Sequence, residues 1–222
     1  MLFKSFYQNI FNKILNIFFP VECFGCNKED TYFCQNCFAK IPLHHLSHKN
    51  LDLKPEINKV LTATDYRNPL VEKIIQGLKF RYIIELAEPL AELLIKFYQQ
   101  LPEKLAEPLI IPVPLHKKRT LERSFNQAEL IAKIFADHFK YPLVTKAVKR
   151  AKNTPHQVGL NKKQRMVNIK NAFTISQPKL IQQKNIIIVD DVLTTGATLK
   201  SLAKTLKDYE AKNIWALTIA QD

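Results

Sequence analysis

One segment constrains the fold more than any other, because residues 185–199 read NIIIVDDVLTTGATL. Four consecutive apolar residues are followed by two adjacent aspartates, a short loop of threonines with one glycine, and the start of a helical pattern. An unbroken apolar run of this kind is typical of a central strand in a parallel sheet, where helices cover both faces. Ligands of such sheets bind at the carboxyl ends of the strands. The segment therefore predicts a binding site at Asp190 and Asp191.

The rest of the chain has the alternation expected of such a sheet. Strands are predicted at residues 60–66, 109–114, 143–148, 185–190 and 214–220, and helices at 69–78, 84–99, 126–139 and 197–209. Strands that alternate with helices are typical of an α/β domain. We therefore predict a mostly parallel sheet flanked by helices.

The loop after the aspartates has the composition of a phosphate site. Its small side chains let backbone N–H groups converge, Gly196 permits close approach, and the helix that follows favours an anion at its N-terminus. Carboxylates do not bind phosphate, but they accept hydrogen bonds from sugar hydroxyls or hold Mg²⁺. The chain contains neither G-x-x-x-x-G-K-[ST] nor G-x-G-x-x-G. The pattern therefore favours a ribose phosphate as the ligand over an ordinary capped helix.

Four cysteines near the beginning of the chain have the spacing of a metal site. Cys23, Cys26, Cys34 and Cys37 form CxxC–x7–CxxC. Two such turns complete a tetrahedral zinc site, and four thiolates leave no open position for catalysis. A redox pair and disulfides are the alternatives, but a redox pair does not predict a second copy. We predict a structural zinc in a small ribbon or knuckle, with Gly25 in a turn where a positive φ is often needed.

The first 22 residues have the pattern of an amphipathic helix. Apolar residues recur at three- and four-residue steps from Phe3 to Phe18, and Pro20 follows them. Packing of this helix against its own protein is favoured, with docking on a partner or peripheral contact with a membrane surface as alternatives. Polar residues interrupt the apolar run, so no signal peptide or transmembrane segment is expected, and a cytoplasmic location is predicted.

The net charge of +13 is concentrated in one third of the chain. Residues 111–185 hold sixteen basic and three acidic residues. An excess of this size favours an anionic partner. Within it, the basic residues from His116 to Arg123 suit a pyrophosphate or a nucleic-acid backbone, and residues 150–173 are a candidate lid. The region offers few exposed aromatic residues for base stacking, so any binding of single strands is expected to be sequence-independent and sensitive to salt.

Residues 189–198, VDDVLTTGAT, resemble the ribose-phosphate motif of type I phosphoribosyltransferases, which bind 5-phosphoribosyl 1-pyrophosphate (PRPP) with Mg²⁺. The resemblance implies that Asp190 and Asp191 hold the ribose hydroxyls and the Mg²⁺ complex. It further implies that the 5′-phosphate is bound by Val192, Leu193, Thr194, Thr195, Gly196, Ala197 and Thr198.

A longer series of motifs is similar to the ComF family of competence proteins. The four-cysteine module is followed by PVPLHxxRxxERxFNQAE, RxxxTPxQxGLxxxxRxxNxxxAF and VDDVLTTGATL, in an order that matches from Cys23 to the end of the chain. The resemblance implies a pyrophosphate loop at His116, Lys117, Lys118 and Arg119, and a hood that includes Arg150, Thr154, Gln157 and Arg165. The basic patch Lys79-Phe80-Arg81 also matches the family. The family usually has glycine where this chain has Tyr82, Ser124 and Asn171.

These observations predict three parts: an amphipathic N-terminal helix at residues 1–22, a zinc-binding module at 23–45 and a phosphoribosyltransferase-like domain at 46–222. The resemblance implies a competence protein that binds PRPP–Mg²⁺, supports uptake of single-stranded DNA in natural transformation and works with DNA-uptake proteins. The alternative is an active cytoplasmic phosphoribosyltransferase that transfers ribose 5-phosphate to a base or amine. Whether the chain is an enzyme is left open by its residues, which name no acceptor.

Overall fold

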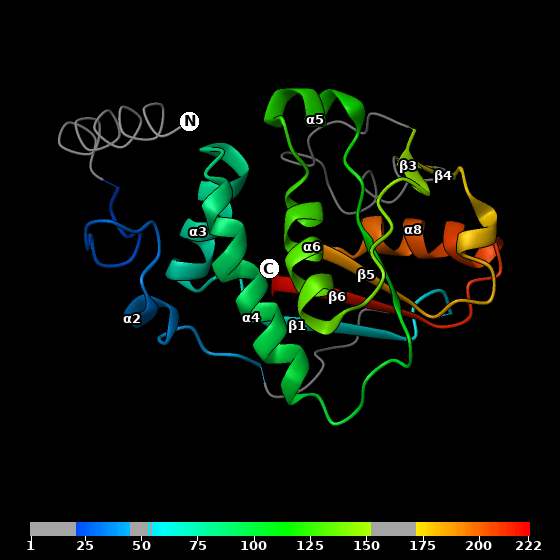
Figure 1. Ribbon diagram of the computed structural model, residues 1–222, viewed down its shortest axis with the longest axis horizontal. Coiled ribbons are helices and arrows are strands. Elements are labelled where there is room, and N and C mark those ends of the chain that lie inside the picture. Colours follow the sequence, from blue (N-terminus) through cyan, green and yellow to red (C-terminus); the bar gives the residue numbers. More distant parts are fainter. Residues whose placement is uncertain (1–20, 45–52, 54, 152–171) are drawn as a thin grey trace, which may run out of the picture.

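A four-stranded parallel sheet forms the centre of the protein (Figure 1). The computed structural model describes residues 21–44, 53, 55–151 and 172–222. Residues 1–20 of the predicted N-terminal helix and the predicted hood residues Thr154, Gln157 and Arg165 lie outside these ranges, and Glu22, at the end of that prediction, forms a bridge with Glu29. Among the described residues, no helix is both long and apolar enough to span a membrane.

The sheet has the order β1-β6-β5-β2, and every neighbouring pair of strands is parallel. The strands are β1 (Lys59–Asp65), β2 (Leu109–Pro112), β5 (Ile186–Leu193) and β6 (Ile214–Gln221). In β5, Ile187 and Val189 belong to one apolar core, whereas Ile186 and Ile188 belong to the other. The apolar run of the sequence is thus buried on both faces, which confirms the predicted central strand.

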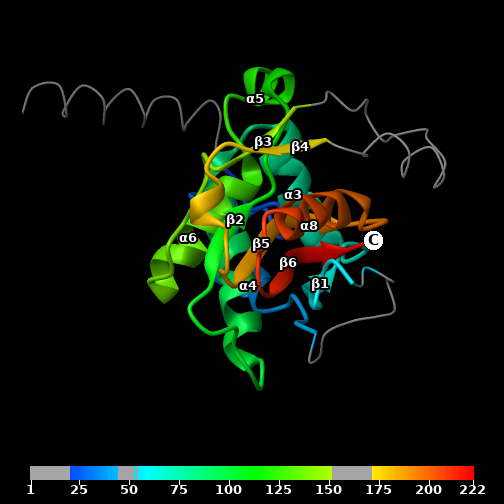
Figure 2. The ribbon, with the colours of Figure 1, turned by 90° about the vertical axis from the view of Figure 1, so that its right-hand side faces the viewer.

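Helices cover both faces of this sheet, as predicted. The helices α3 (Pro69–Phe80), α4 (Ala87–Gln100) and α6 (Gln127–Phe139) contribute to one core, and α8 (Ala197–Asp208) contributes to the other. Figure 2 shows α6 and α8 on opposite sides of the sheet. The predicted helix at residues 84–99 begins with a 3₁₀ turn, η1 (Ile84–Leu86), and a second such turn, η2 (Pro178–Leu180), precedes β5.

The predicted strand at residues 143–148 is largely wrong. Within it, Leu143 alone forms a bridge to the main sheet, with Ile110 of β2, whereas Val148 begins the strand β3 (Val148–Arg150), which pairs antiparallel with β4 (Phe173–Ile175) in a separate small sheet. The backbone N–H of Ile110 bonds the carbonyl of Pro142 at 2.9 Å on the outer edge of β2. Pro112 lies two residues further along the same edge of β2, and it has no N–H to donate to a neighbouring strand. A fifth strand therefore stops after one bridge.

The four-cysteine segment packs beside α3 and contains the one-turn helix α2 (Gln35–Phe38) (Figure 1). Lys73 of α3 donates a hydrogen bond to the carbonyl of Phe24 at 3.2 Å. The Phe24 ring lies over Gly77, where an added Cβ would be 3.2 Å from Phe24 Cζ and 2.5 Å from Leu86 Cδ1. A glycine in the middle of α3 thus allows the segment to approach the helix closely.

A short helix, α5 (Lys117–Arg123), replaces the basic loop that the sequence predicted. The His116 side chain caps its start, because Nδ1 accepts a hydrogen bond from the backbone N–H of Lys118 at 3.2 Å. The helix ends at Ser124, whose φ of 64° lies in the left-handed region. Such a backbone favours glycine, because a Cβ there contacts the carbonyl oxygen.

We expect Ser124→Gly to raise the free energy of unfolding by about 0.5–1 kcal/mol, because glycine relieves the strain of the left-handed backbone. The gain is limited because glycine also makes the unfolded chain more flexible. Urea unfolding measures the change. Ser124→Ala is the matched control, since it removes the hydroxyl and keeps the Cβ; an equal gain in both variants would contradict the backbone explanation.

Candidate functional site

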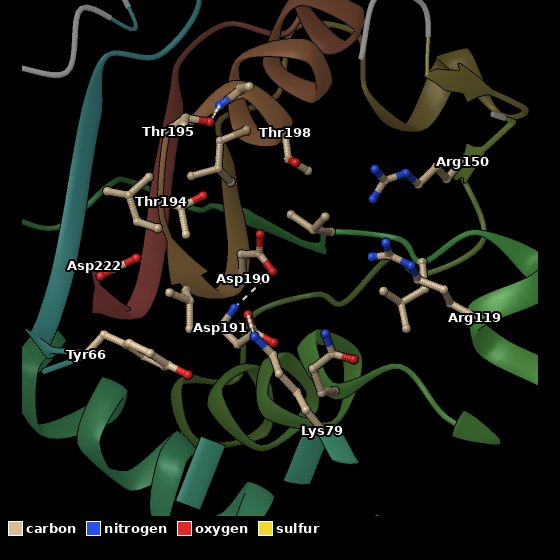
Figure 3. Close-up of a pocket in the computed structure, with 18 of the residues that line it drawn as sticks. Tyr66, Lys79, Arg119, Arg150, Asp190, Asp191, Thr194, Thr195, Thr198 and Asp222 are labelled. Atoms are coloured by element: carbon tan, nitrogen blue, oxygen red, sulfur yellow. Dashed lines mark hydrogen bonds and ion pairs between the residues drawn. The ribbon is translucent and has the colours of Figure 1, made fainter. Parts of the chain in front are cut away.

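A pocket of about 390 Å³ opens at the carboxyl ends of the four parallel strands (Figure 3). The loop that joins β5 to α8 forms one wall, and α3, α5, α6 and β3 contribute the others. The lining side chains that carry charge are Lys79, Arg119, Arg123, Arg150, Asp190, Asp191 and Asp222. The structure therefore brings the predicted aspartates and the predicted phosphate loop into one cavity.

Asp191 is the most buried of these acidic side chains, with 5% of its surface exposed. Lys79, at the end of α3, places its Nζ 2.8 Å from Oδ1 of Asp191. The other oxygen, Oδ2, is buried and has no hydrogen-bond partner among the described residues. A buried carboxylate oxygen without a partner is costly, so this atom is suited to accept a hydrogen bond from a ligand or to face a cation.

Asp190 lies beside it in a setting that opposes ionisation. Burial and the negative charge of Asp191 raise the pKa of Asp190 to about 7, against the attraction of Lys79, the N–H of Asp191 and the charge of Arg150. The N–H of Asp191 donates to Oδ1 of Asp190 at 3.0 Å. Two adjacent carboxylates with one close lysine favour a bound cation or hydroxyl donor that stabilises their charge.

The segment from Thr194 to Thr198 consists of a short loop and the first two residues of α8, Ala197 and Thr198. Gly196 has a φ of 71°, and a Cβ there would lie 3.0 Å from the Leu53 side chain, so both the backbone and the packing favour glycine. Thr195 Oγ1 accepts a hydrogen bond from the N–H of Ala197 at 3.4 Å. The first turn of α8, a twelve-residue helix, lines the pocket at Ala197 and Thr198, and the N-terminus of such a helix is suited to an anion.

Arginines lie on the opposite side of Asp190 from these threonines (Figure 3). Arg150 is only 9% exposed, and its guanidinium lies 5.6 Å from the centre of the Phe173 ring. Burial and the charge of Arg119 lower the pKa of Arg150, whereas Asp190 opposes this shift. Burial, and then the charge of Arg123, likewise lower the pKa of Arg119. Partly desolvated guanidiniums in one cavity favour an anionic ligand.

The predicted pyrophosphate loop is only partly brought to the pocket. Arg119 lines it, whereas His116 caps α5 and Lys118 is exposed outside the lining. Lys117 is the first residue of α5. Arg150, predicted as a hood residue, lines the cavity from β3. The remaining hood residues belong to the segment that the structure does not describe.

Sequence reasoning missed two residues that shape the site. Lys79 was part of a noted basic patch, but its pairing with Asp191 depends on a contact across the fold. Asn126 caps α6 by accepting from the N–H of Ala128 at 3.1 Å, and it donates to the carbonyl of Val113 at 3.1 Å. Asn126 thereby fixes α6 against the end of β2. An asparagine directly before an apolar helical pattern was the signal for this cap.

The four cysteines form a second candidate site, beside α3. Their sulfur atoms all lie within 4.8 Å of one another, and those of Cys26 and Cys34 are 3.6 Å apart. Zinc bound to four thiolates at about 2.3 Å requires sulfur atoms about 3.8 Å apart, so these residues fit such an ion. A chelating cluster of this shape could hold a metal, and its four thiols leave no place for a reacting ligand.

The protein environment favours a thiolate at Cys23. Burial opposes its ionisation, but hydrogen bonds from the N–H groups of Cys34, Gly25 and Cys26 outweigh burial and lower the pKa of Cys23 to about 6. Burial, and hydrogen bonds that the Cys37 thiol donates to the neighbouring sulfur atoms, raise the pKa of Cys37 to about 12. A bound metal would stabilise all four as thiolates.

Gly25 is required for a reason that the sequence did not show. Its φ is not positive; the left-handed residues of this segment are Asn27 and Asp30. A Cβ on Gly25 would instead lie 2.5 Å from Cys37 Sγ and 2.8 Å from Leu70 Cδ2. The glycine therefore makes room for the fourth sulfur and for α3.

The chain is similar to a known domain family and to several proteins of comparable length. Residues 126–222 match the phosphoribosyl transferase domain family. Competence protein F of Haemophilus influenzae is 34% identical over 210 residues, which cover 89% of this chain and 90% of that protein. DNA utilization protein YhgH of Escherichia coli is 31% identical over 206 residues, covering 88% and 87%. Competence protein ComFC of Bacillus subtilis is 25% identical over 215 residues, covering 91% and 85%.

We expect about one zinc per chain in protein purified without chelator, measured by elemental analysis. Cys26→Ser should lose most of this zinc, because three thiolates and a hydroxyl form a much weaker site. Lys28→Ser, on the same exposed turn, is the control and should keep it. Retention of a full equivalent by Cys26→Ser, or its absence from the unmodified protein, would contradict the assignment.

We expect Lys79→Met to lower the free energy of unfolding by about 3 kcal/mol, because it leaves the Asp191 carboxylate buried without its cation. The double variant Lys79→Met/Asp191→Asn should recover most of this loss in urea unfolding. Lys133→Met is the control: its pair with Asp137, at 2.6 Å, is exposed, and the loss should stay below about 1 kcal/mol. Strictly additive losses at Lys79 and Asp191 would show that the pair is not coupled.

Proposed function

The chain belongs to the competence protein F family, and we propose that it binds PRPP with Mg²⁺ in the pocket and handles single-stranded DNA during natural transformation. A competence role is supported by relatives that match nearly the whole chain. The choice of PRPP as the ligand is supported by the order of groups across one cavity: a helix N-terminus, then two carboxylates, then two arginines (Figure 3).

This order of groups corresponds to the order of groups in PRPP. The loop from Thr194 to Thr198 would bind the 5′-phosphate through its N–H groups and hydroxyls. Asp190 and Asp191 would accept hydrogen bonds from the ribose hydroxyls, which gives the unpartnered Oδ2 of Asp191 a donor. Arg119 and Arg150 would bind the pyrophosphate.

The charge of the pocket explains why a divalent cation is part of the proposal. Among the described residues, four cationic and three acidic side chains line the cavity. PRPP carries roughly five negative charges at neutral pH. The protein alone therefore leaves most of that charge uncompensated, and Mg²⁺ bound beside the carboxylates would compensate a further part of it. The residues present fit such an ion, because carboxylate and phosphate oxygens are its preferred ligands.

DNA is the second anion of the proposal. Eleven of the sixteen basic residues between positions 111 and 185 belong to the described part of the chain, and three of them, Arg119, Arg123 and Arg150, line the pocket. The other basic residues leave a surplus for a polymeric anion. Binding to the backbone of single strands would be sequence-independent and would weaken steeply with salt.

The proposal also divides the chain into parts with separate roles. We propose that residues 23–45 form a zinc-binding module, and that residues 46–222 form the phosphoribosyltransferase-like domain. The predicted amphipathic helix at residues 1–22 and partners in the DNA-uptake machinery complete the proposal. A structural role for the zinc is supported by the four-thiol cluster, which packs against Leu70 of α3, and by Phe24 of the same segment, whose ring lies over Gly77.

We expect calorimetry to show Mg²⁺-dependent PRPP binding that Asp190→Asn/Asp191→Asn weakens at least tenfold, because each charged hydrogen bond contributes about 1.5–3 kcal/mol. Asp208→Asn, an exposed aspartate at the end of α8, is the control. Equal affinity in the double variant, or binding that chelation leaves unchanged, would show that the pocket is misassigned.

An assay of pyrophosphate release distinguishes binding from catalysis. The competence proposal predicts no release beyond spontaneous hydrolysis of PRPP. Release that a particular base or amine stimulates would instead establish the alternative, an active phosphoribosyltransferase.

A further inference from the structure

Exposed aromatic side chains gather at the rim of the pocket. Phe80 is 60% exposed and Tyr82 is 51% exposed, and Ile84, two residues further on, is 54% exposed. These three are half of the large apolar side chains that stand exposed in the described part of the chain. Phe80 also lines the pocket, and it directly follows Lys79, which pairs with Asp191. The patch is therefore continuous with the candidate site.

Residues from a distant part of the sequence complete this rim. The Arg123 guanidinium, at the end of α5, lies 5.4 Å from the centre of the Phe80 ring. The ring of Phe125 meets Tyr82 edge-on, with centroids 6.4 Å apart. Arg123 is held in turn by Gln127, which accepts a hydrogen bond from it at 3.1 Å. The rim is thus formed at the contact between α3 and the α5–α6 connection.

The backbone at Tyr82 is itself unusual. Its φ of 58° lies in the left-handed region, which a bulky aromatic residue rarely adopts. Residues held in such conformations gather at functional sites. Here the turn directs the chain away from α3 and leaves the tyrosine ring exposed.

Cations alternate with these rings. Residues 79–82 read Lys-Phe-Arg-Tyr. Arg81 is exposed, and its guanidinium lies 5.2 Å from the centre of the Phe24 ring in the cysteine segment. Arg119 lies close enough to Arg123 for their charges to interact. Flat rings that alternate with cations match the backbone and the bases of an unpaired strand, since the rings stack on bases and the cations face phosphates.

We propose that Phe80 and Tyr82 form a stacking platform for unpaired bases of single-stranded DNA, whose phosphates pair with Arg81 and Arg123. This inference rests on the proposed handling of DNA and adds the surface that performs it. These aromatic residues lie outside positions 111–185: Phe80 is the last residue of α3, and Tyr82 follows the helix. Charge complementarity favours a polyanion over an apolar peptide, and the exposed rings favour unpaired bases over a duplex.

Fluorescence anisotropy with a labelled oligothymidylate tests the platform in the full-length protein. We expect Phe80→Ala and Tyr82→Ala each to weaken binding roughly 5- to 100-fold, which corresponds to the loss of one stacked base. The slope of log affinity against log salt should not change, because no cation is removed. Arg81→Gln should instead reduce that slope by about 0.7, the value for one phosphate contact on a single strand.

Tyr209→Ala is the matched control, because Tyr209 is 39% exposed at the far end of α8. Phe80→Trp should retain affinity, and its fluorescence should be quenched by the oligonucleotide. The chain has a single tryptophan, Trp215, which is buried and contributes a constant background. Thermal unfolding of each variant confirms that these exposed substitutions leave the fold intact.

An oligonucleotide of abasic sites separates stacking from charge. The unmodified protein should bind it about as weakly as Phe80→Ala binds the oligothymidylate, and a duplex of equal length should also bind weakly. Equal affinity for abasic and normal strands, or no loss in either alanine variant, would overturn the platform and leave DNA handling in place. Absence of any single-strand binding by the unmodified protein would overturn the proposed DNA function itself.

Discussion

Two carboxylates follow each other at the buried end of β5, and the groups around them can be understood as compensation for that charge. Lys79 reaches Asp191 from α3 at 2.8 Å, and the charge of Arg150 acts on Asp190 from β3. Even so, the pKa of Asp190 is raised to about 7 by burial and by its neighbour. A site with this residual instability is suited to a ligand that brings hydroxyl donors and a cation, because both would stabilise the ionised pair. PRPP with Mg²⁺ supplies both.

Helix α3 connects the three functional features of the chain. Its first turn places Leu70 against the cysteines, its glycine admits the Phe24 ring, and its last turn delivers Lys79 to the pocket and Phe80 to the rim. Loss of the metal would therefore act on the pocket through one helix, since Phe24 also lies beneath Arg81. A metal held by the four cysteines would therefore support the helix that contributes Lys79 to the pocket.

The sequence allowed the central strand, the loop from Thr194 to Thr198 and the cysteine cluster to be predicted, because each is written in consecutive residues with one dominant pattern. It could not show contacts between distant segments, such as Lys79 with Asp191 or Phe80 with Arg123. The predicted strand at residues 143–148 does not form because of a residue in another segment. Pro112 of β2 has no N–H with which a fifth strand could continue its pairing. The sequence predicts a loop after His116, whereas the structure has a short helix there. The His116 side chain caps that helix, and composition does not reveal such a cap.

We propose that the pocket at the end of β5 holds PRPP across its two aspartates. A crystal structure of the protein with PRPP and Mn²⁺ in place of Mg²⁺ tests this most directly, because anomalous scattering locates the metal independently of the ligand. We predict the ribose hydroxyls on Asp190 and Asp191, the 5′-phosphate at residues 194–198, and the metal between the ribose and the pyrophosphate. A ligand bound with its phosphates elsewhere, or an anomalous peak remote from both aspartates, would contradict the account.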